Sequence, residues 1–219
     1  GYRTPGLYEI YGGYLYNGNL ITVGNPDLEP EESTSYEVGV DQSLADGKVQ
    51  FGATWFKTEF DDMIIFDGWD MRYENAKEGE NAGIETYVRL QPWKMVRFDL
   101  AYTYIDSRSK ADENADWTRN TYLPRNKVDF IMTLYPMDKL TMALNVKWHD
   151  EQIVPLYQGW NSVRWEEDSV TTVNLSTTYK ALQNMDLFAR IDNLLDEDYT
   201  ESAYCMPGLS VYGGLKLHF

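Results

Sequence analysis

Apolar and polar residues alternate one by one along much of this chain. The clearest stretch is residues 140–148, where every second position is apolar: Leu140, Met142, Leu144, Val146 and Trp148. The positions between them hold Thr141, Ala143, Asn145 and Lys147. Because successive side chains of a strand point to opposite faces, this pattern predicts a strand with one apolar and one polar face.

The same alternation recurs from about Ser33 to the end of the chain. It covers residues 49–55, 84–90, 96–104, 128–134, 173–179, 187–191 and 209–219. We predict about eight or nine long strands, each near the roughly 9–11 residues that a tilted membrane strand needs.

The connections between these strands alternate in length. Short ones are expected at 44–47, 91–94, 136–139 and 180–184, and long ones at 107–122, 150–168 and 193–207. Such regular alternation is typical of an up-and-down barrel with short turns at one end and long loops at the other. The link from Asp67 to Arg72 is an exception, since it is short for a loop on the long side.

Composition adds two constraints. Aromatic residues make up 15% of the chain, with 17 Tyr and 7 Trp, which suits aromatic girdles at two membrane interfaces. Trp55, Tyr104, Trp148 and Tyr179 stand near the ends of apolar rows, where such rings are expected. No run approaches the roughly 18 apolar residues of a spanning helix, so the predicted fold is an all-β, antiparallel transmembrane β-barrel.

The formal charge of -16 argues against nucleic acid as a partner, because binding phosphates requires excess Lys and Arg. The single Cys205 cannot form an internal disulfide. The sequence begins at Gly1 without Met or an apolar leader, so we expect a processed chain or a fragment, and favour a fragment.

The last predicted strand ends on an aromatic residue. Leu209, Val211, Leu215, Leu217 and Phe219 share one face. An unpaired strand edge in lipid leaves backbone groups without hydrogen bonds, so this strand must pair with another. A terminal Phe after alternating apolar residues resembles the assembly signal of bacterial outer-membrane proteins.

Several segments, in order, resemble the C-terminal half of TonB-dependent outer-membrane receptors. They are Tyr2-Arg3-Thr4-Pro5 through Glu9, Asn25-Pro26-Asp27-Leu28-Glu29-Pro30-Glu31 followed by Ser35-Tyr36-Glu37-Val38-Gly39, Asn81-Ala82-Gly83-Ile84-Glu85, Leu123-Pro124-Arg125-Asn126-Lys127, Asp192-Asn193-Leu194-Leu195-Asp196-Glu197-Asp198-Tyr199, and Pro207-Gly208-Leu209 through Phe219. Tyr2 and Thr4 depart from the family's pattern. The residues that carry the family motifs are Arg3, Pro5, Asn25, Pro26, Leu28, Pro30, Glu31, Asn193 and Phe219.

The resemblance implies a partial wall of a 22-stranded barrel, with the N-terminal plug and its TonB-contacting box outside this sequence. Residues 1–32 are then expected to form an extracellular or pore-facing segment, and residues 33–219 the C-terminal strands. The implied partners are outer-membrane lipid, TonB through the plug, the barrel-assembly machinery through the strand ending in Phe219, and a metal-chelate ligand such as a siderophore or cobalamin. The implied location is the bacterial outer membrane.

Ligand candidates are the aromatic and cationic residues of the long loops, because such side chains offer stacking area and charge to a bulky ligand. They are Trp117, Arg119, Tyr157, Trp160, Arg164, Trp165 and Tyr204. The alternative is that they pack against one another or lie in the interfacial belt.

No cofactor or metal site is predicted. Asp112, Glu113, Asp116, Glu166, Glu167 and Asp168 do not match the spacing of a calcium loop, and His149 and His218 have no companion at ligand spacing. Nor is the chain expected to be an enzyme: the one catalytic alternative pairs Ser210 or Ser169 with His218 or His149.

Two other classes of protein stay open at this point. One is a self-contained small barrel acting as a porin or adhesin, which requires about eight to ten strands that close on themselves. The other is a soluble, aromatic-rich carbohydrate-binding β-sandwich.

Overall fold

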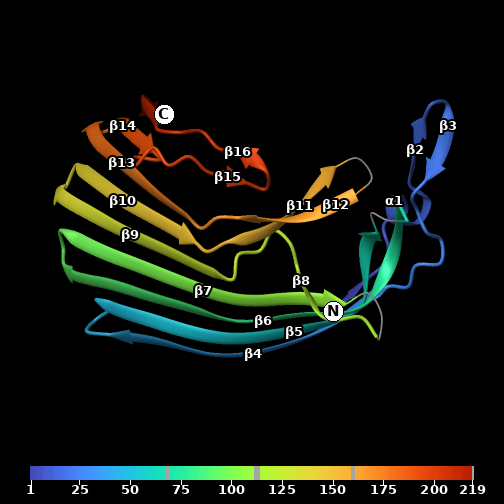
Figure 1. The fold of residues 1–219 in the computed structure, drawn as a ribbon. Helices are drawn as coiled ribbons and strands as arrows, with labels where there is room; N and C mark the ends of the chain where they lie inside the picture. The colour runs from blue at the N-terminus through green and yellow to red at the C-terminus, as the bar shows by residue number, and fades with distance from the viewer. Residues whose placement is uncertain (68–69, 111–113, 159–160, 219) are drawn as a thin grey trace.

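The computed structural model describes residues 1–67, 70–110, 114–158 and 161–218. These form one curved antiparallel sheet with hairpins at one end (Figure 1). In the described part of the chain, the long strands in spatial order are β4 (Glu31–Leu44), β5 (Val49–Asp67), β6 (Arg72–Trp93), β7 (Val96–Lys110), β9 (Asn126–Met137), β10 (Leu140–His149), β13 (Val170–Leu182), β14 (Met185–Asp192) and β17 (Ser210–Leu217). Each pairs with the next of these long strands along the chain, as an up-and-down barrel requires.

The two faces of this sheet differ in chemistry. One cross-strand row runs over all of these strands and is apolar throughout: Leu44, Val49, Leu90, Phe98, Met132, Leu144, Leu175, Ile191 and Val211. On the opposite face, a neighbouring row runs through Gln50, Arg89, Asp99, Ile131, Asn145 and Asn174. The alternation read from the sequence is therefore confirmed as a physical separation of the faces.

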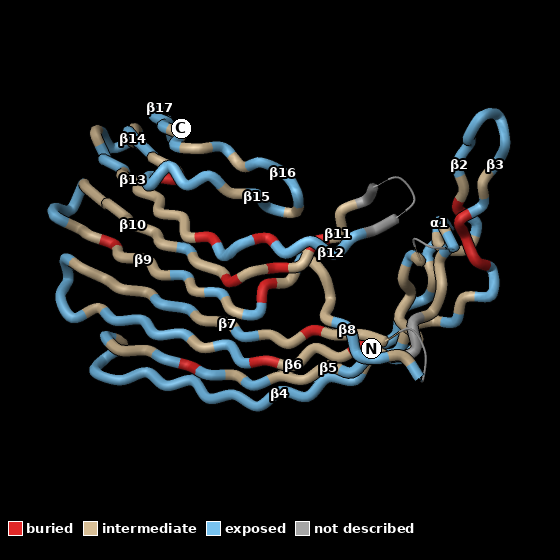
Figure 2. Tube along the Cα trace, viewed as in Figure 1, coloured by how far each residue is buried: buried red, intermediate tan, exposed pale blue. Residues whose placement is uncertain are grey.

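The sheet is a single layer without an interior core. Among the described residues, the only buried hydrophobic side chains are Val23, Val154 and Val170, and the long strands are almost entirely half-buried or exposed (Figure 2). A soluble sandwich would bury one face of each sheet against the other, so that alternative is wrong. An exposed apolar face over a whole sheet is expected where the solvent is lipid.

The sheet is also open. Within the described residues, β4 and β17 pair only on their inner sides, apart from the two-residue strand β1 (Tyr2–Arg3) beside β4. A self-contained barrel would join these edges, and this chain does not do so. The fold is thus a partial antiparallel transmembrane barrel.

The alternation of turns and loops is also confirmed. The connections between β4 and β5, β6 and β7, β9 and β10, and β13 and β14 are tight and lie at one end (left in Figure 1). The opposite end carries the long connections, which contain β8 (Thr118–Arg119), the hairpin β11 (Gln152–Gln158) with β12 (Asn161–Glu167), and the hairpin β15 (Thr200–Glu201) with β16 (Tyr204–Cys205). We call this the loop end.

The predicted strand length is exceeded by β4 and β7, with 14 and 15 residues, and most of all by β5 and β6, with 19 and 22 residues. For β5 and β6 the prediction is wrong. The reason lies on their outward face. Above the row Trp55, Ile84 and Tyr104, this face becomes charged. Lys57 pairs with Glu80 at 3.2 Å, Arg108 with Glu80 at 3.0 Å, and Lys110 with Glu78 at 3.1 Å. The hairpin therefore continues beyond the lipid, which explains why the link from Asp67 to Arg72 is short.

Residues 1–30 contain structure that the sequence did not predict. Besides β1 there are a short helix α1 (Leu7–Tyr11) and a hairpin of β2 (Gly13–Tyr16) and β3 (Asn19–Thr22). The hairpin turns at Asn17 and Gly18, whose φ angles are 49° and 79°. Asn-Gly is the strongest short hairpin signal, so this element was readable. No helix in the described residues is long and apolar enough to cross a membrane.

The face assignment predicts how the wall responds to charge. In the complete receptor, Leu144→Arg should lower the free energy of unfolding by about 2–4 kcal/mol. Arginine on the lipid face is unfavourable by that amount near the bilayer midplane. Asn145→Arg, one residue along on the inward face, should cost less than about 1 kcal/mol.

The measurement is urea unfolding in lipid vesicles, followed by the gel mobility of the folded barrel. An equal loss in both variants would show that the faces are assigned wrongly.

Candidate functional site

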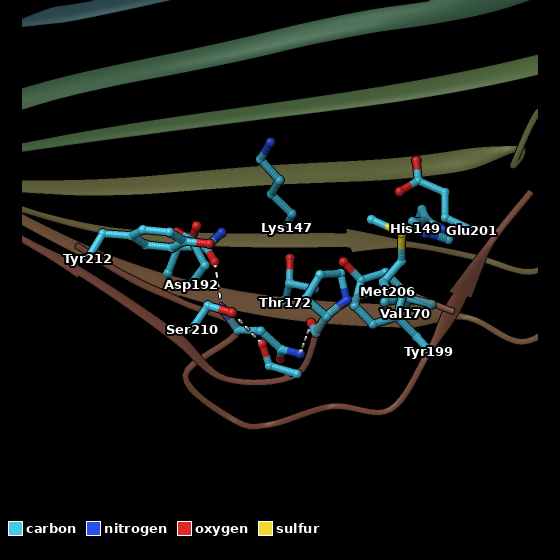
Figure 3. Close-up of a pocket in the computed structure, with 14 residues that line it drawn as sticks. Lys147, His149, Val170, Thr172, Asp192, Tyr199, Glu201, Met206, Ser210 and Tyr212 are labelled. Atoms are coloured by element: carbon cyan, nitrogen blue, oxygen red, sulfur yellow. Dashed lines mark hydrogen bonds between the residues drawn. The ribbon is translucent and has the colours of Figure 1, made fainter. Parts of the chain in front are cut away.

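Polar side chains gather on the inward face of the sheet at the loop end. Here β10, β13, β14 and β17 and the connection from β14 to β17 enclose a cavity of about 430 Å³ (Figure 3), which we call the wall cavity. The strands contribute Lys147, His149, Thr172, Asp192, Ser210 and Tyr212, and the loop contributes Tyr199, Glu201 and Met206. It is a concave site with mixed polar and apolar lining, as small-molecule sites usually are.

A second cavity of about 580 Å³ lies on the other side of the β15–β16 hairpin, and we call it the loop cavity. It is lined by Trp165, Glu166, Glu167, Asp168, Glu197, Asp198, Thr200 and Cys205, among others. Three residues line both cavities: Val170, Tyr199 and Met206. The two spaces therefore share one wall.

The charges of the wall cavity are partly neutralised. Arg190 pairs with Asp192 at 2.8 Å, and its guanidinium lies 4.8 Å from the ring centre of Tyr212. The Nδ1 atom of His149 lies 2.8 Å from the carbonyl oxygen of Asp150. Burial and the neighbouring Glu201 carboxylate raise the pKa of Tyr199, so its phenol stays protonated and offers one O–H donor.

Asn193 holds the base of the loop between β14 and β17. It is 4% exposed and has a φ of 51°. Its side-chain amide donates to the carbonyls of Glu197 at 2.9 Å and Pro207 at 3.4 Å, and its side-chain oxygen accepts the Glu197 N–H at 3.0 Å. The side chain thus joins the two ends of the loop that lines both cavities.

Glu167 joins the two loop-end hairpins. It is 4% exposed, and its carboxylate accepts hydrogen bonds from the backbone N–H of Ala203 at 2.7 Å and of Ser202 at 3.2 Å, and from the Gln152 amide at 2.7 Å. Burial by itself raises the pKa of Glu167, but these hydrogen bonds and one from Thr200 outweigh it and hold the pKa below 4.5. The carboxylate is therefore ionised at neutral pH.

The predicted ligand residues whose side chains the structure describes do not converge on one site. Trp117 lies against two cations, with Arg108 at 5.0 Å and Lys110 at 5.3 Å from its ring centre. Trp165 lines the loop cavity. Tyr204 is exposed and lines neither cavity.

The two predicted arginines are bound to backbone. Arg119 donates to the carbonyls of Leu123 and Glu151, both at 3.1 Å, and Arg164 donates to the carbonyl of Arg119. They are brought together, but they hold loop segments to each other. The side chain of Tyr157 and the whole of Trp160 lie outside the described residues.

The motif residues near the start of the chain form a clamp. Arg3 makes a two-pronged contact with Glu31, including 2.8 Å from Nη2 to Oε1, and reaches Glu9 at 3.1 Å. Asn25 docks the following segment onto β6, because its amide donates to the Tyr73 carbonyl at 3.0 Å.

Of the remaining motif residues, Pro5, Leu28 and Pro30 are half-buried and Pro26 is exposed, and Phe219 lies outside the described residues.

The sequence reading missed the strand residues of the wall cavity, such as Lys147, Thr172 and Tyr212. Their signal was present, because each occupies a polar-face position near the loop end of a strand that the alternation had identified. The cavity is lined by the inward-facing rows at the loop end and not by the loop aromatics alone.

One acidic cluster and one Ser–His pair lie close enough to be compared with a metal site and a catalytic site. Within the described residues, Asp67, Asp70 and Glu74 bring ligand atoms within 4.8 Å of one another at the tip of β5 and β6. These are not the acidic residues considered from the sequence. Ser210 and His149 line the same cavity, but Ser210 donates to the Gly208 carbonyl at 3.1 Å, and no hydrogen bond joins these two side chains.

Comparison with known proteins agrees with this architecture. The family model described as TonB dependent receptor-like, beta-barrel matches residues 1–194, so the chain belongs to that family. This is a family of receptors and not of enzymes, and its barrels lie in the bacterial outer membrane.

Two curated relatives match nearly the whole chain. The ferric-pyoverdine BN7/BN8 receptor of Pseudomonas putida is 26% identical over 223 residues, covering 97% of this chain and 26% of that receptor. The iron-regulated outer membrane virulence protein of Vibrio cholerae is 25% identical over 239 residues, covering 100% of this chain and 36% of that protein. The chain thus spans between about a quarter and just over a third of their length.

Solved structures share the fold. The ferric enterobactin receptor of Pseudomonas aeruginosa, in complex with BCV-L6, aligns with a TM-score of 0.77 at 21% identity, covering 99% of this chain and 37% of that one. The ferripyoverdine receptor of the same organism aligns with a TM-score of 0.70 at 15% identity, covering 87% and 27%.

Acid should release the β15–β16 hairpin. Because the folded-state pKa of Glu167 lies below its ordinary value of 4.5, its contribution to stability is complete above that value and is lost as the pH falls through the folded pKa. A spin label on Cys205, which is exposed, should be immobile at neutral pH and become mobile as the pH falls through the lowered pKa of Glu167.

In Glu167→Gln, the same label should be mobile at every pH. A label whose mobility does not change with pH in the wild-type receptor would contradict the predicted release.

Removing the Asn193 side chain should loosen the whole loop. Asn193→Ala leaves the backbone groups of Glu197 and Pro207 without their side-chain partner. It also puts an alanine at a positive φ. Together these effects should make local opening of the loop easier by about 2–3 kcal/mol. Amide exchange at Glu197 should accelerate by roughly 30–150-fold, measured by mass spectrometry. Leu195→Ala, at a 60% exposed position in the same loop, is the control and should change little.

Proposed function

We propose that this chain is part of the wall of an outer-membrane receptor that imports a ferric siderophore. The observation that carries the proposal is the match of nearly the whole chain to a ferric-pyoverdine receptor and to an iron-regulated outer-membrane protein. The polar cavities at the loop end support it, since they lie where a ligand arriving from outside would first meet the barrel. No observation favours cobalamin or another chelate.

The open edges of the sheet support the proposal that further strands complete the barrel. Unpaired backbone groups in lipid cost several kcal/mol each, so further strands must complete the barrel. We infer that a plug within it couples uptake to TonB, and that the assembly machinery recognises the closing strand with Phe219. In this proposal residues 1–32 form the extracellular or pore-facing segment and residues 33–219 the C-terminal part of the barrel.

The ligand contacts are proposed at the wall cavity and its neighbour. Of the loop candidates, Trp165 is supported by its place in the loop cavity. Trp117, Arg119 and Arg164 already have partners within the chain, which argues for a role in holding the loops. Tyr157, Trp160 and Tyr204 stay candidates from their loop positions alone.

The test is iron uptake by a strain that lacks the complete receptor gene. We expect the deletion to abolish transport of radioactive iron supplied as ferric pyoverdine or ferric enterobactin, and the intact gene to restore it only when TonB is present. Cobalamin uptake is the control and should be unaffected. Normal uptake of both ferric siderophores by the deletion strain, with a defect for cobalamin, would contradict the proposal.

A further inference from the structure

The β15–β16 hairpin is the partition between the two cavities. Successive residues of β15 point to opposite sides, so that Thr200 lines the loop cavity and Glu201 the wall cavity. At its base, the Met206 N–H donates to the Tyr199 carbonyl at 3.0 Å, and both residues line both cavities. The position of this one hairpin decides whether the cavities are separate.

The turn of this hairpin is stabilised by a side chain from another part of the chain. Ser202 and Ala203 have φ angles of 54° and 66°, and a two-residue hairpin turn with positive φ at both positions normally selects Asn-Gly. Neither Ser nor Ala favours this conformation, because a residue with a Cβ is strained in the left-handed region. Their two backbone N–H groups both point to the Glu167 carboxylate, at 3.2 Å and 2.7 Å.

Glu167 belongs to the other loop-end hairpin. It ends β12, where it pairs with Gln152 of β11, and the Gln152 amide donates to it at 2.7 Å. A charged acceptor roughly doubles the strength of a hydrogen bond, so the carboxylate offsets the strain of the turn. It also fixes the hairpin β15–β16 to the hairpin β11–β12.

We propose that Glu167 is a positioning residue for ligand binding: by holding the Ser202–Ala203 turn, it keeps the wall cavity and the loop cavity as two separate subsites for one ferric chelate. Glu167 does not have to touch the chelate, because its carboxylate is buried and occupied. This inference rests on the proposed function, since it takes a ferric siderophore as the occupant.

The test compares two variants that each remove one carboxylate charge from the loop between β10 and β13. Glu167→Gln replaces an acceptor oxygen with a donor, so it faces the donors of Ser202 and Gln152 with the wrong chemistry. Glu151→Gln changes a half-buried carboxylate next to Gln152 in the same loop, and this residue lines neither cavity. The complete receptor is used, with ferric enterobactin and ferric pyoverdine as probes and tryptophan fluorescence quenching as the readout.

Glu167→Gln should raise the Kd for the chelate that binds by at least about tenfold, and Glu151→Gln should change it by less than about threefold. A third variant separates positioning from direct contact. Adding Ser202→Asn and Ala203→Gly to Glu167→Gln supplies the turn with residues that favour positive φ, and should bring the Kd back to within about threefold of wild type.

Unchanged affinity in Glu167→Gln would overturn the proposal, and so would a loss that the turn substitutions do not repair, because that result indicates direct contact. If Glu167→Gln alone does not fold, the comparison is made within the Ser202→Asn, Ala203→Gly receptor, where adding Glu167→Gln should change the Kd by less than about threefold. A wild-type receptor that binds neither chelate would instead refute the proposed function, and this inference with it.

Discussion

Backbone hydrogen bonding in a solvent that offers none is the constraint on which the structure depends. In lipid every N–H and C=O group must be satisfied by the chain itself, and this chain does so by pairing each long strand with its neighbour in register. Register in turn decides which side chains meet lipid, because a slip of one residue would exchange the two faces. The apolar row from Leu44 to Val211 is unbroken for that reason.

The sheet has almost no buried core in the described residues, so the rigidity of its loop end must come from contacts other than apolar packing. Polar contacts at the loop end take over part of the role that packing has in a soluble domain. Arg3 with Glu31, Asn193 with Glu197, and Glu167 with Ser202 and Ala203 each join segments far apart in sequence or close a loop on itself. In each case a buried or half-buried side chain satisfies backbone or charged groups that would otherwise be unpaired.

The strands and their faces followed from the sequence, because a period of two is written directly into residues such as 140–148. The lengths of β5 and β6 did not follow, since above Trp55 the outward face becomes charged and the alternation of polarity disappears while pairing continues. The motif residue Asn193 was identified from resemblance, but its role depends on the Pro207 carbonyl, which only the folded loop brings near. Glu167 was read as one of several loop acids, because nothing in its local sequence indicates that the turn at Ser202 will meet it.

The strands and the loops are held in place by different interactions, and this difference has an evolutionary consequence. The strands are tied to one another by backbone pairing, whereas the β11–β12 and β15–β16 hairpins are tied to each other through one carboxylate. Substitutions in the loops can therefore accumulate without disturbing the register of a single membrane strand. Loop sequences can thus diverge between related chains while the paired strands are inherited almost unchanged.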